Sequence, residues 1–391
     1  ARISALPRPL TGAEQSLVTA SGDFSSRLFQ AISSSKRDDN VFISPLSASM
    51  ALGMTLNGAA GSSYDEMRRT LGFGTLTRDE ILRSYRDLIA LLRGLDTQVD
   101  FRIANAIWWR DSFGPSIEPT FITESKDYFG ASAQGADFSQ PAAIAAINAW
   151  VNASTKGKIT SIVDALDSDI VLFLANAIYF KGDWRKSFPK GATKTAPFVT
   201  STGSTVQVPT MQRTGITRLG GEGGRVVVEL GYGGDAYVMT IMLPAVGEDI
   251  NALVNALTPN EWRVQIASMH DTELDLSMPK FTMSWERLLN ADLSAMGMPT
   301  PFIPGQGDFS RMSSTRGHDL FIGFVKQKTF VDVNEVGTEA AAVTGVGIGV
   351  TSAPQRVAIH VDRPFVFAIR ERLSGAMLFV GKIVNPVAIA P

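Results

Sequence analysis

The spacing of hydrophobic residues divides the chain into a helical first part and a strand-rich remainder. Early segments repeat apolar residues about every 3.6 positions, which is typical of amphipathic helices. Helices are therefore predicted over residues 11–36, 44–58, 79–95 and, more briefly, 147–159. The second begins at Ser44 and Pro45, a capping residue followed by a first-turn proline, and it ends at Gly58.

Most later segments either alternate between apolar and polar residues or are continuously apolar, and both patterns predict strands. The continuous run at residues 169–184 is expected for a central strand that is covered on both faces. Strands are also predicted at 99–110, 273–281 and 319–335, hairpins at 225–244 and 363–384, and a helix at 285–298. Helices followed by mixed β-structure, with no linker or repeat, indicate one α+β domain spanning residues 1–391.

One stretch near the C-terminus gives two conflicting signals. From residue 338 to residue 350 every second position is Thr, Ala, Val or Ile, which is a strand pattern. The positions between them include Gly345, Gly347 and Gly349. Glycine disfavours a strand because it loses more chain entropy on ordering and offers no side chain to pack. The stretch therefore predicts a strand that does not form readily.

Composition narrows the class of protein. The chain has 391 residues, of which 45% are hydrophobic and 19% charged, as expected for a soluble globular protein with a large core. A net charge of −2 without a basic block argues against nucleic acid or an anionic membrane as a partner. The absence of cysteine excludes disulfides and thiol catalysis. No signal peptide opens the chain, and the excess of Arg over Lys, with abundant Ala and Gly, is typical of a GC-rich bacterial source.

The residues that usually carry catalysis do not form a recognisable constellation. His270, His318 and His360 are the only histidines, and none lies beside a nucleophile motif or at a metal-binding spacing. The glycine-rich residues 220–224 and 345–349 do not open a helix after a strand, so they do not predict a phosphate site. We therefore expect no enzymatic activity, no metal and no cofactor.

Several motifs, taken in order, resemble the serpin family of protease inhibitors. "NEVGTEAAA" precedes a loop of small residues and then "RPFVFAIRERLSGAMLFVGKIVNP". "NVFISPLSASMALGMTLNGAAG", "INAWVNASTKGKI" and "LANAIYFKGDW" match earlier parts of the family pattern, so the resemblance covers nearly the whole chain. It implies a fold of three β-sheets and about nine helices, with residues 335–356 as an exposed reactive-centre loop that can insert into the main sheet.

The resemblance also implies a mechanism. A serine protease cleaves the loop as a substrate, and the loop then inserts as a new strand and carries the acylated protease to the far pole. The conflicting strand pattern fits this order of events, because the glycines keep the loop mobile until cleavage and the alternating residues are buried afterwards. The predicted function is suicide inhibition from a metastable state. The alternative is a non-inhibitory serpin with a carrier, storage or chaperone role.

Further expectations concern location and partners. We expect an extracellular or secreted monomer. Activation by heparin is not expected, because Arg83, Arg86 and Arg93 of the predicted helix at 79–95 are interleaved with acidic residues.

The resemblance assigns three groups of residues to loop insertion. The hinge, in which small residues follow a Glu-x-Gly-Thr-Glu pattern as in inhibitory members, comprises Glu335, Gly337, Thr338, Glu339, Ala340, Ala341 and Ala342. The breach, where insertion begins, comprises Trp184, Lys280 and Glu335, and the shutter at the sheet's centre comprises Ser44, Ser47, Asn176 and Gln327. Gln327 stands where the family usually has a histidine, and glutamine cannot titrate near neutral pH.

The cleaved bond is predicted by counting along the loop. Counting from the hinge places it between Thr351 and Ser352, with the bond between Val350 and Thr351 as the next choice. Counting back from the C-terminal motif gives Ala353 instead, but Pro354 would then follow the bond, where proline fits poorly. Because residues 350–353 are small and uncharged, we expect an elastase-like or subtilisin-like target protease.

Overall fold

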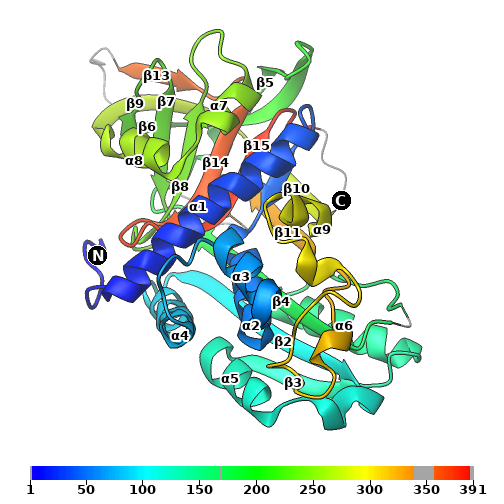
Figure 1. Cartoon of the computed structure of the whole chain (residues 1–391). Helices are drawn as coiled ribbons and strands as arrows, with labels where there is room; N and C mark the ends of the chain where they lie inside the picture. The colour runs from blue at the N-terminus through cyan, green and yellow to red at the C-terminus, as the bar shows by residue number, and fades with distance from the viewer. Residues whose placement is uncertain (1, 168, 339–355, 388–391) are drawn as a thin grey trace.

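The structure, a computed structural model, describes residues 2–167, 169–338 and 356–387 (Figure 1). These residues form nine α-helices and two hydrogen-bonded networks of strands. The α-helices are α1 Gly12–Ser35, α2 Pro45–Gly58, α3 Gly61–Thr70, α4 Arg78–Gly94, α5 Pro119–Phe129, α6 Pro141–Ser154, α7 Ile250–Ala256, α8 Pro259–Ala267 and α9 Asn290–Ala295. The 3-10 helices are η1 Asp111–Ser116, η2 Lys190–Ala192, η3 Thr300–Phe302 and η4 Gly317–Asp319.

The two networks differ in size and in their place along the chain. The nine-stranded sheet has the order β1 Val41–Ile43, β15 Met377–Ile383, β14 Phe365–Glu371, β8 Tyr237–Leu243, β7 Val226–Gly231, β6 Thr205–Gly220, β9 His270–Pro279 and β13 Val357–His360, with β5 Lys194–Val199 paired to β6. The six-stranded sheet has the order β10 Phe281–Leu288, β11 Lys326–Val333, β12 Gly337–Thr338, β4 Leu172–Asp183, β2 Val99–Arg110 and β3 Ala131–Ala136.

The expectation of three sheets is corrected to two for the part of the chain that the structure describes. The reason is β6, which pairs with β5, β7 and β9. With 16 residues it is long enough to pair with two groups of strands at once, so they join into one hydrogen-bonded sheet. The expectation of about nine helices agrees with the nine α-helices found among the described residues.

Local sequence signals explain where the main helices begin. Thr11 and Glu14 form a capping box at the start of α1, and Thr77 and Glu80 do the same at α4. The Ser44 side chain caps α2 by accepting the amide of the third residue of the helix, and Pro45 follows it. The shorter helix predicted at residues 147–159 corresponds to α6. This helix begins earlier, with a proline as its first residue, and ends earlier, at Ser154.

Two predicted elements need correction. The helix expected at 285–298 is limited to α9, which begins at Asn290. Residues 285–288 instead belong to β10 and pair with β11. The strand expected at 319–335 begins only at Lys326, and residues 320–325 are not in a strand. In both cases the local sequence pattern is compatible with the predicted element. Pairing with neighbouring strands, which the local pattern does not contain, determines the structure that forms.

The six-stranded sheet is covered on both faces, which explains why β4 is almost continuously apolar. On one face, β4 contacts α2, and the largest hydrophobic cluster draws residues from this side and from the nine-stranded sheet. On the other face α6 packs on β2 and β4, with Trp108, Ile147 and Phe173 in a second cluster. Side chains at even positions of β4 therefore point towards α2 and those at odd positions towards α6.

Candidate functional site: a hinge above an open slot

A two-residue strand, β12, lies between β4 and β11 at one end of the six-stranded sheet. Gly337 and Thr338 are opposite Asp183 and Gly182 of β4, and Thr338 is also opposite Val333 of β11. Both pairings are antiparallel. A Cβ at position 337 would come within 2.2 Å of the Gly182 carbonyl oxygen, so only glycine fits here without a shift of the backbone.

Thr338 is held by Tyr232, an aromatic residue that directly follows β7 and forms an isolated β-bridge with Trp184. Its hydroxyl lies 2.6 Å from the hydroxyl of Tyr232, and both residues are buried. Burial raises the pKa of Tyr232 above its ordinary value, so the phenol stays protonated. The Tyr232 ring stacks on Trp184 at a centroid distance of 4.5 Å, and the Trp184 indole donates to the Asn334 carbonyl at 2.8 Å. Tyr232 and Trp184 thus contact each other, and together they contact the chain on both sides of Gly337, at Asn334 and at Thr338.

Glu335 anchors the chain just before β12. Its carboxylate accepts hydrogen bonds from Lys280 at 3.1 Å and from Thr193 at 2.9 Å. Burial alone would raise the pKa of Glu335, but hydrogen bonds from its own amide, Thr193 and Lys280 outweigh burial, so the pKa lies below its ordinary value. The carboxylate is therefore charged at neutral pH. Trp184, Lys280 and Glu335, predicted as one group, are brought together around the hinge.

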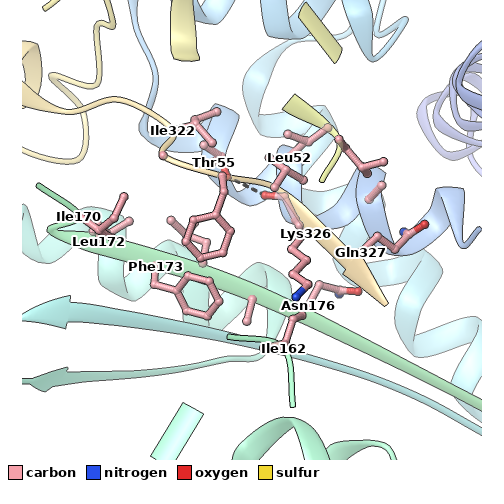
Figure 2. A pocket seen from close by; sticks show the side chains of 18 of the residues that line it. Leu52, Thr55, Ile162, Ile170, Leu172, Phe173, Asn176, Ile322, Lys326 and Gln327 are labelled. Carbon is pink, nitrogen blue, oxygen red and sulfur yellow. Dashed lines mark hydrogen bonds between the residues drawn. The ribbon is translucent and has the colours of Figure 1, made fainter. Parts of the chain in front are cut away.

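An open slot lies below β12. Among the described residues β4 and β11 share no ladder, and only β12 lies between them in the sheet. A cavity of about 90 Å³ occupies this position, bounded by residues 169–178 on one side, residues 319–328 on the other, and α2. Figure 2 shows Leu172 and Phe173 on the β4 side and Ile322 and Lys326 across from them.

A chain of polar contacts crosses the sheet at one end of the slot, where Figure 2 shows Asn176 and Gln327 near each other. The Gln327 amide donates to the Ser44 carbonyl at 2.7 Å, and its oxygen accepts the Ser44 amide at 3.1 Å. The Ser47 hydroxyl donates to Asn176, whose amide donates to Asn105 at 2.6 Å. All four predicted shutter residues therefore belong to one network that runs from β11 through α2 to β4 and β2.

Three contributing residues were not predicted. Asn105 could have been found, since it is an amide within an apolar run, as Asn176 is. Thr193 and Tyr232 carry no such local signal, because their partners in the hinge lie 142 and 106 residues away in the sequence.

The remaining predicted site residues lie outside the described part of the chain. They are Glu339, Ala340, Ala341, Ala342, Val350, Thr351 and Ser352. Arg356 directly precedes β13 and pairs with Glu273 at 3.1 Å, and β13 runs parallel to β9. The loop therefore starts at the six-stranded sheet and ends at the nine-stranded one.

Comparison with known proteins identifies the family. A family model described as "Serpin (serine protease inhibitor)" matches residues 19–386. Serpin B11 of Mus musculus is 33% identical over 391 residues, covering 95% of this chain and 99% of the relative. The leukocyte elastase inhibitor of Homo sapiens is 31% identical over 388 residues, covering 95% and 100%. The chain belongs to the serpin family, a family of serine protease inhibitors that includes the leukocyte elastase inhibitor.

Solved structures support the same fold. Human thyroxine-binding globulin complexed with thyroxine has a TM-score of 0.86 and 27% identity, covering 96% of this chain and 100% of that one. The thermophilic serpin tengpin in its native state has a TM-score of 0.85 and 27% identity, covering 98% and 97%. The serpin fold expected from the sequence is confirmed.

The family match also corrects a prediction that was purely negative. The missing catalytic constellation had suggested only that the chain is not an enzyme, whereas the match assigns a positive class, protease inhibition. Within the described residues no helix is long and apolar enough to span a membrane. The same part of the chain contains no group of acidic, histidine or cysteine residues arranged to hold a metal ion.

Proposed function

We propose that this serpin is a suicide inhibitor whose loop, once cleaved, inserts between β4 and β11 of the six-stranded sheet. The observation that carries the proposal is β12, which already occupies the start of that path. Thr338 pairs with both neighbouring strands, and the slot directly below it is lined by the edges of the same two strands. An added strand there would supply backbone partners to both edges.

The pairing of β12 also sets the register of the inserted strand. Because the pairing is antiparallel, each step along the loop moves one residue back along β4 and β11. Thr344, six residues after Thr338, would then lie between Asn176 and Gln327. A polar loop residue would thus meet the polar network at the sheet's centre. The later alternating residues Val346 and Ile348 would fall between apolar parts of the slot.

The hinge and shutter roles follow from this path. Glu335, Gly337 and Thr338 would start the strand and Glu339 would follow. Ala340, Ala341 and Ala342 would enter next, with little side-chain volume to clash. Trp184 and Lys280 would hold the entry point. Ser44, Ser47, Asn176 and Gln327 would exchange partners as β4 and β11 accept the new strand.

The target proposed is an elastase-like or subtilisin-like serine protease that cleaves between Thr351 and Ser352, with the bond between Val350 and Thr351 as the next choice. The small, uncharged residues 350–353 support this choice, and so does the similarity to a leukocyte elastase inhibitor. Mixing the protein with an elastase-like protease should give a covalent band near the summed mass on a denaturing gel. The released C-terminal peptide should begin at Ser352 in mass spectrometry.

Trypsin provides the matched comparison. We expect trypsin-like enzymes to be inhibited poorly, and Thr351→Arg to shift the preference towards them. A released peptide that starts at Val357, together with efficient trypsin inhibition, would show that the assigned bond is wrong.

A carrier role is the second candidate, favoured by the structural similarity to thyroxine-binding globulin. The small residues after Thr338 argue against it, because non-inhibitory serpins, as the resemblance implies, tend to have bulky, charged or proline residues there. Simple cleavage of the loop without a covalent band would favour the carrier role over inhibition.

The further proposals concern assembly and location. We propose that residues 1–391 form one domain that acts as an extracellular monomer, without heparin. The geometry of α4 supports the last point: Arg86 pairs with Asp87 at 2.8 Å and Arg93 donates to the Ile103 carbonyl, so these arginines do not form a free basic stripe.

A further inference from the structure

A second cavity, of about 260 Å³, lies where the chain leaves β4, and none of the described hinge residues and no residue that lines the slot belongs to its wall. Its wall is formed by the chain just after β4, by β6, by the C-terminal part of β7 and the turn after it, by the start of β9, and by Arg2 near the N-terminus. Five basic side chains line it: Arg2, Arg185, Lys186, Arg213 and Arg218. The acidic side chains in the lining are Glu229, Asp235 and Asp271. The cavity is therefore richer in positive than in negative charge.

Two of the three acids are already neutralised by partners in the wall. Glu229 pairs with Arg218 at 2.6 Å and also with buried Arg370, and Asp235 pairs with Arg2 at 2.6 Å. Asp271 is the remaining acid. It lines the same cavity as three cations, Arg185, Lys186 and Arg213, none of which has a carboxylate within ion-pair distance among the described residues.

These three cations donate only to neutral oxygens. Arg185 donates to the Gly233 carbonyl at 3.3 Å, and Lys186 donates to the Ile216 carbonyl at 3.3 Å. Arg213 donates to the Thr217 hydroxyl at 3.0 Å and to the Lys186 carbonyl. Carbonyl and hydroxyl dipoles satisfy hydrogen-bond donors, but they do not compensate a formal charge.

Arg213 is the most enclosed of the three. Its guanidinium lies over the Phe188 ring at 5.1 Å, and burial lowers its pKa to about 10. The side chain is still charged at neutral pH, so a cation is held in partly desolvated surroundings with no carboxylate of the described residues within ion-pair distance. An anion entering the cavity would supply a counter-charge.

We propose that this cavity binds a small multivalent oxyanion, such as inorganic phosphate or pyrophosphate, through Arg185, Lys186 and Arg213. Guanidinium groups suit phosphate because their parallel N–H donors match two oxygens at once. Arg185 and Lys186 directly follow Trp184, which contacts the hinge, whereas Arg213 lies on β6. A bound oxyanion therefore ties the end of β4 to the nine-stranded sheet.

Isothermal titration calorimetry of the full chain with pyrophosphate tests the proposal, at an ionic strength held constant with potassium chloride. We expect one saturable site and affinity at least about tenfold weaker in the double variant Arg185→Ala, Lys186→Ala. Both side chains are exposed, so the variant should fold, which thermal unfolding checks. Arg263→Ala on α8 is the matched control, because it removes an exposed arginine outside the cavity and should leave the affinity unchanged.

A second measurement reports the tie itself. Pyrophosphate should increase the protection of amides at residues 182–188 in hydrogen exchange, and the double variant should lose this effect. The proposal is overturned if the wild-type chain gives no saturable binding, if the double variant binds equally well, or if Arg263→Ala weakens binding as much. It is also overturned if the double variant only slows association with a protease, since the cavity would then be a protein contact. The calorimetric result does not depend on inhibition.

Discussion

At the scale of single residues, Thr338 is the residue from which the proposed insertion starts, since it already pairs with β4 and β11. Its side chain is buried and its hydroxyl contacts Tyr232. The surroundings of position 338 therefore accommodate only a small residue with one polar group. Gly337 before it is required by the close approach of the Gly182 carbonyl. A larger or charged side chain at this point has no space and no partner.

Thr338→Arg should convert the inhibitor into a substrate. Position 338 is already buried in β12, so an unpaired guanidinium there is costly and should weaken the pairing from which insertion proceeds. Deacylation of the protease should then outrun insertion. On a denaturing gel the covalent band should be replaced by cleaved inhibitor, while Thr338→Ser should retain the covalent band. Full complex formation by Thr338→Arg would contradict the proposed entry point.

Lys382 provides a prediction for stability against pH. Its buried ammonium group on β15 donates to Asn251 at 2.8 Å and to the Arg37 carbonyl at 3.0 Å, with no carboxylate contact among the described residues. Burial lowers its pKa from 10.5 to about 8. Below about pH 8 both states hold the proton and the native state bears the full desolvation cost. Between about pH 8 and 10.5 the native state releases the proton first, which relieves the cost.

The urea midpoint of the wild-type chain should therefore rise from about pH 7.5 to about pH 9.5, relative to the variant Lys382→Met. The difference should correspond to at most about 3 kcal/mol, because each pKa unit is worth about 1.4 kcal/mol. The variant is compared at every pH because it keeps all other titrating groups. A relative midpoint that stays level or falls would contradict the burial argument.

At the scale of elements, the sequence predicts what local pattern and capping determine. The starts of α1, α2 and α4 follow from their caps, and β4 follows from its apolar run. The strand at residues 285–288 was missed because its pattern also fits a helix, and only its partner β11 decides. The start of β11 at Lys326 could not be predicted, because residues 320–325 can form a strand only if another strand pairs with them, and none of the described strands does.

The same distinction applies to the site. The resemblance to serpins selected Glu335, Lys280, Trp184 and the polar centre, and the structure brings these residues together. Tyr232 and Thr193 were beyond sequence reasoning, since a lone hydroxyl residue in a hairpin or loop acquires meaning only from a distant contact.

The contact between Asn176 on β4 and Asn105 on β2 makes an element-scale prediction. Asn176→Ala should lower the free energy of unfolding by about 1–3 kcal/mol, because it leaves the buried Asn105 oxygen and the Ser47 hydroxyl without their partner. Urea unfolding of Asn176→Ala, of Asn105→Ala and of the double variant should give a coupling energy between the two positions above about 0.5 kcal/mol. Additive effects of the two substitutions would show that the amides do not act together.

At the scale of the whole molecule, the loop connects two sheets that share one hydrophobic core. It leaves the six-stranded sheet at Thr338 and returns to the nine-stranded sheet at Arg356. While intact it is held at both ends, so cleavage is what allows the full length of the N-terminal part to enter the slot. We predict that after cleavage this part pairs with β4 in the register set by Thr338.

A disulfide tests that register most directly, and the chain contains no cysteine that could interfere. Val343 is five residues after Thr338, so insertion would place it opposite Ala177 on β4, within disulfide range. The variant Val343→Cys, Ala177→Cys is oxidised before and after cleavage by an elastase-like protease. Val343→Cys, Ile178→Cys serves as control, since Ile178 points to the other face of the sheet. We predict rapid cross-linking only in the first pair and only after cleavage. Equal cross-linking before cleavage, or none after it, would contradict insertion between β4 and β11.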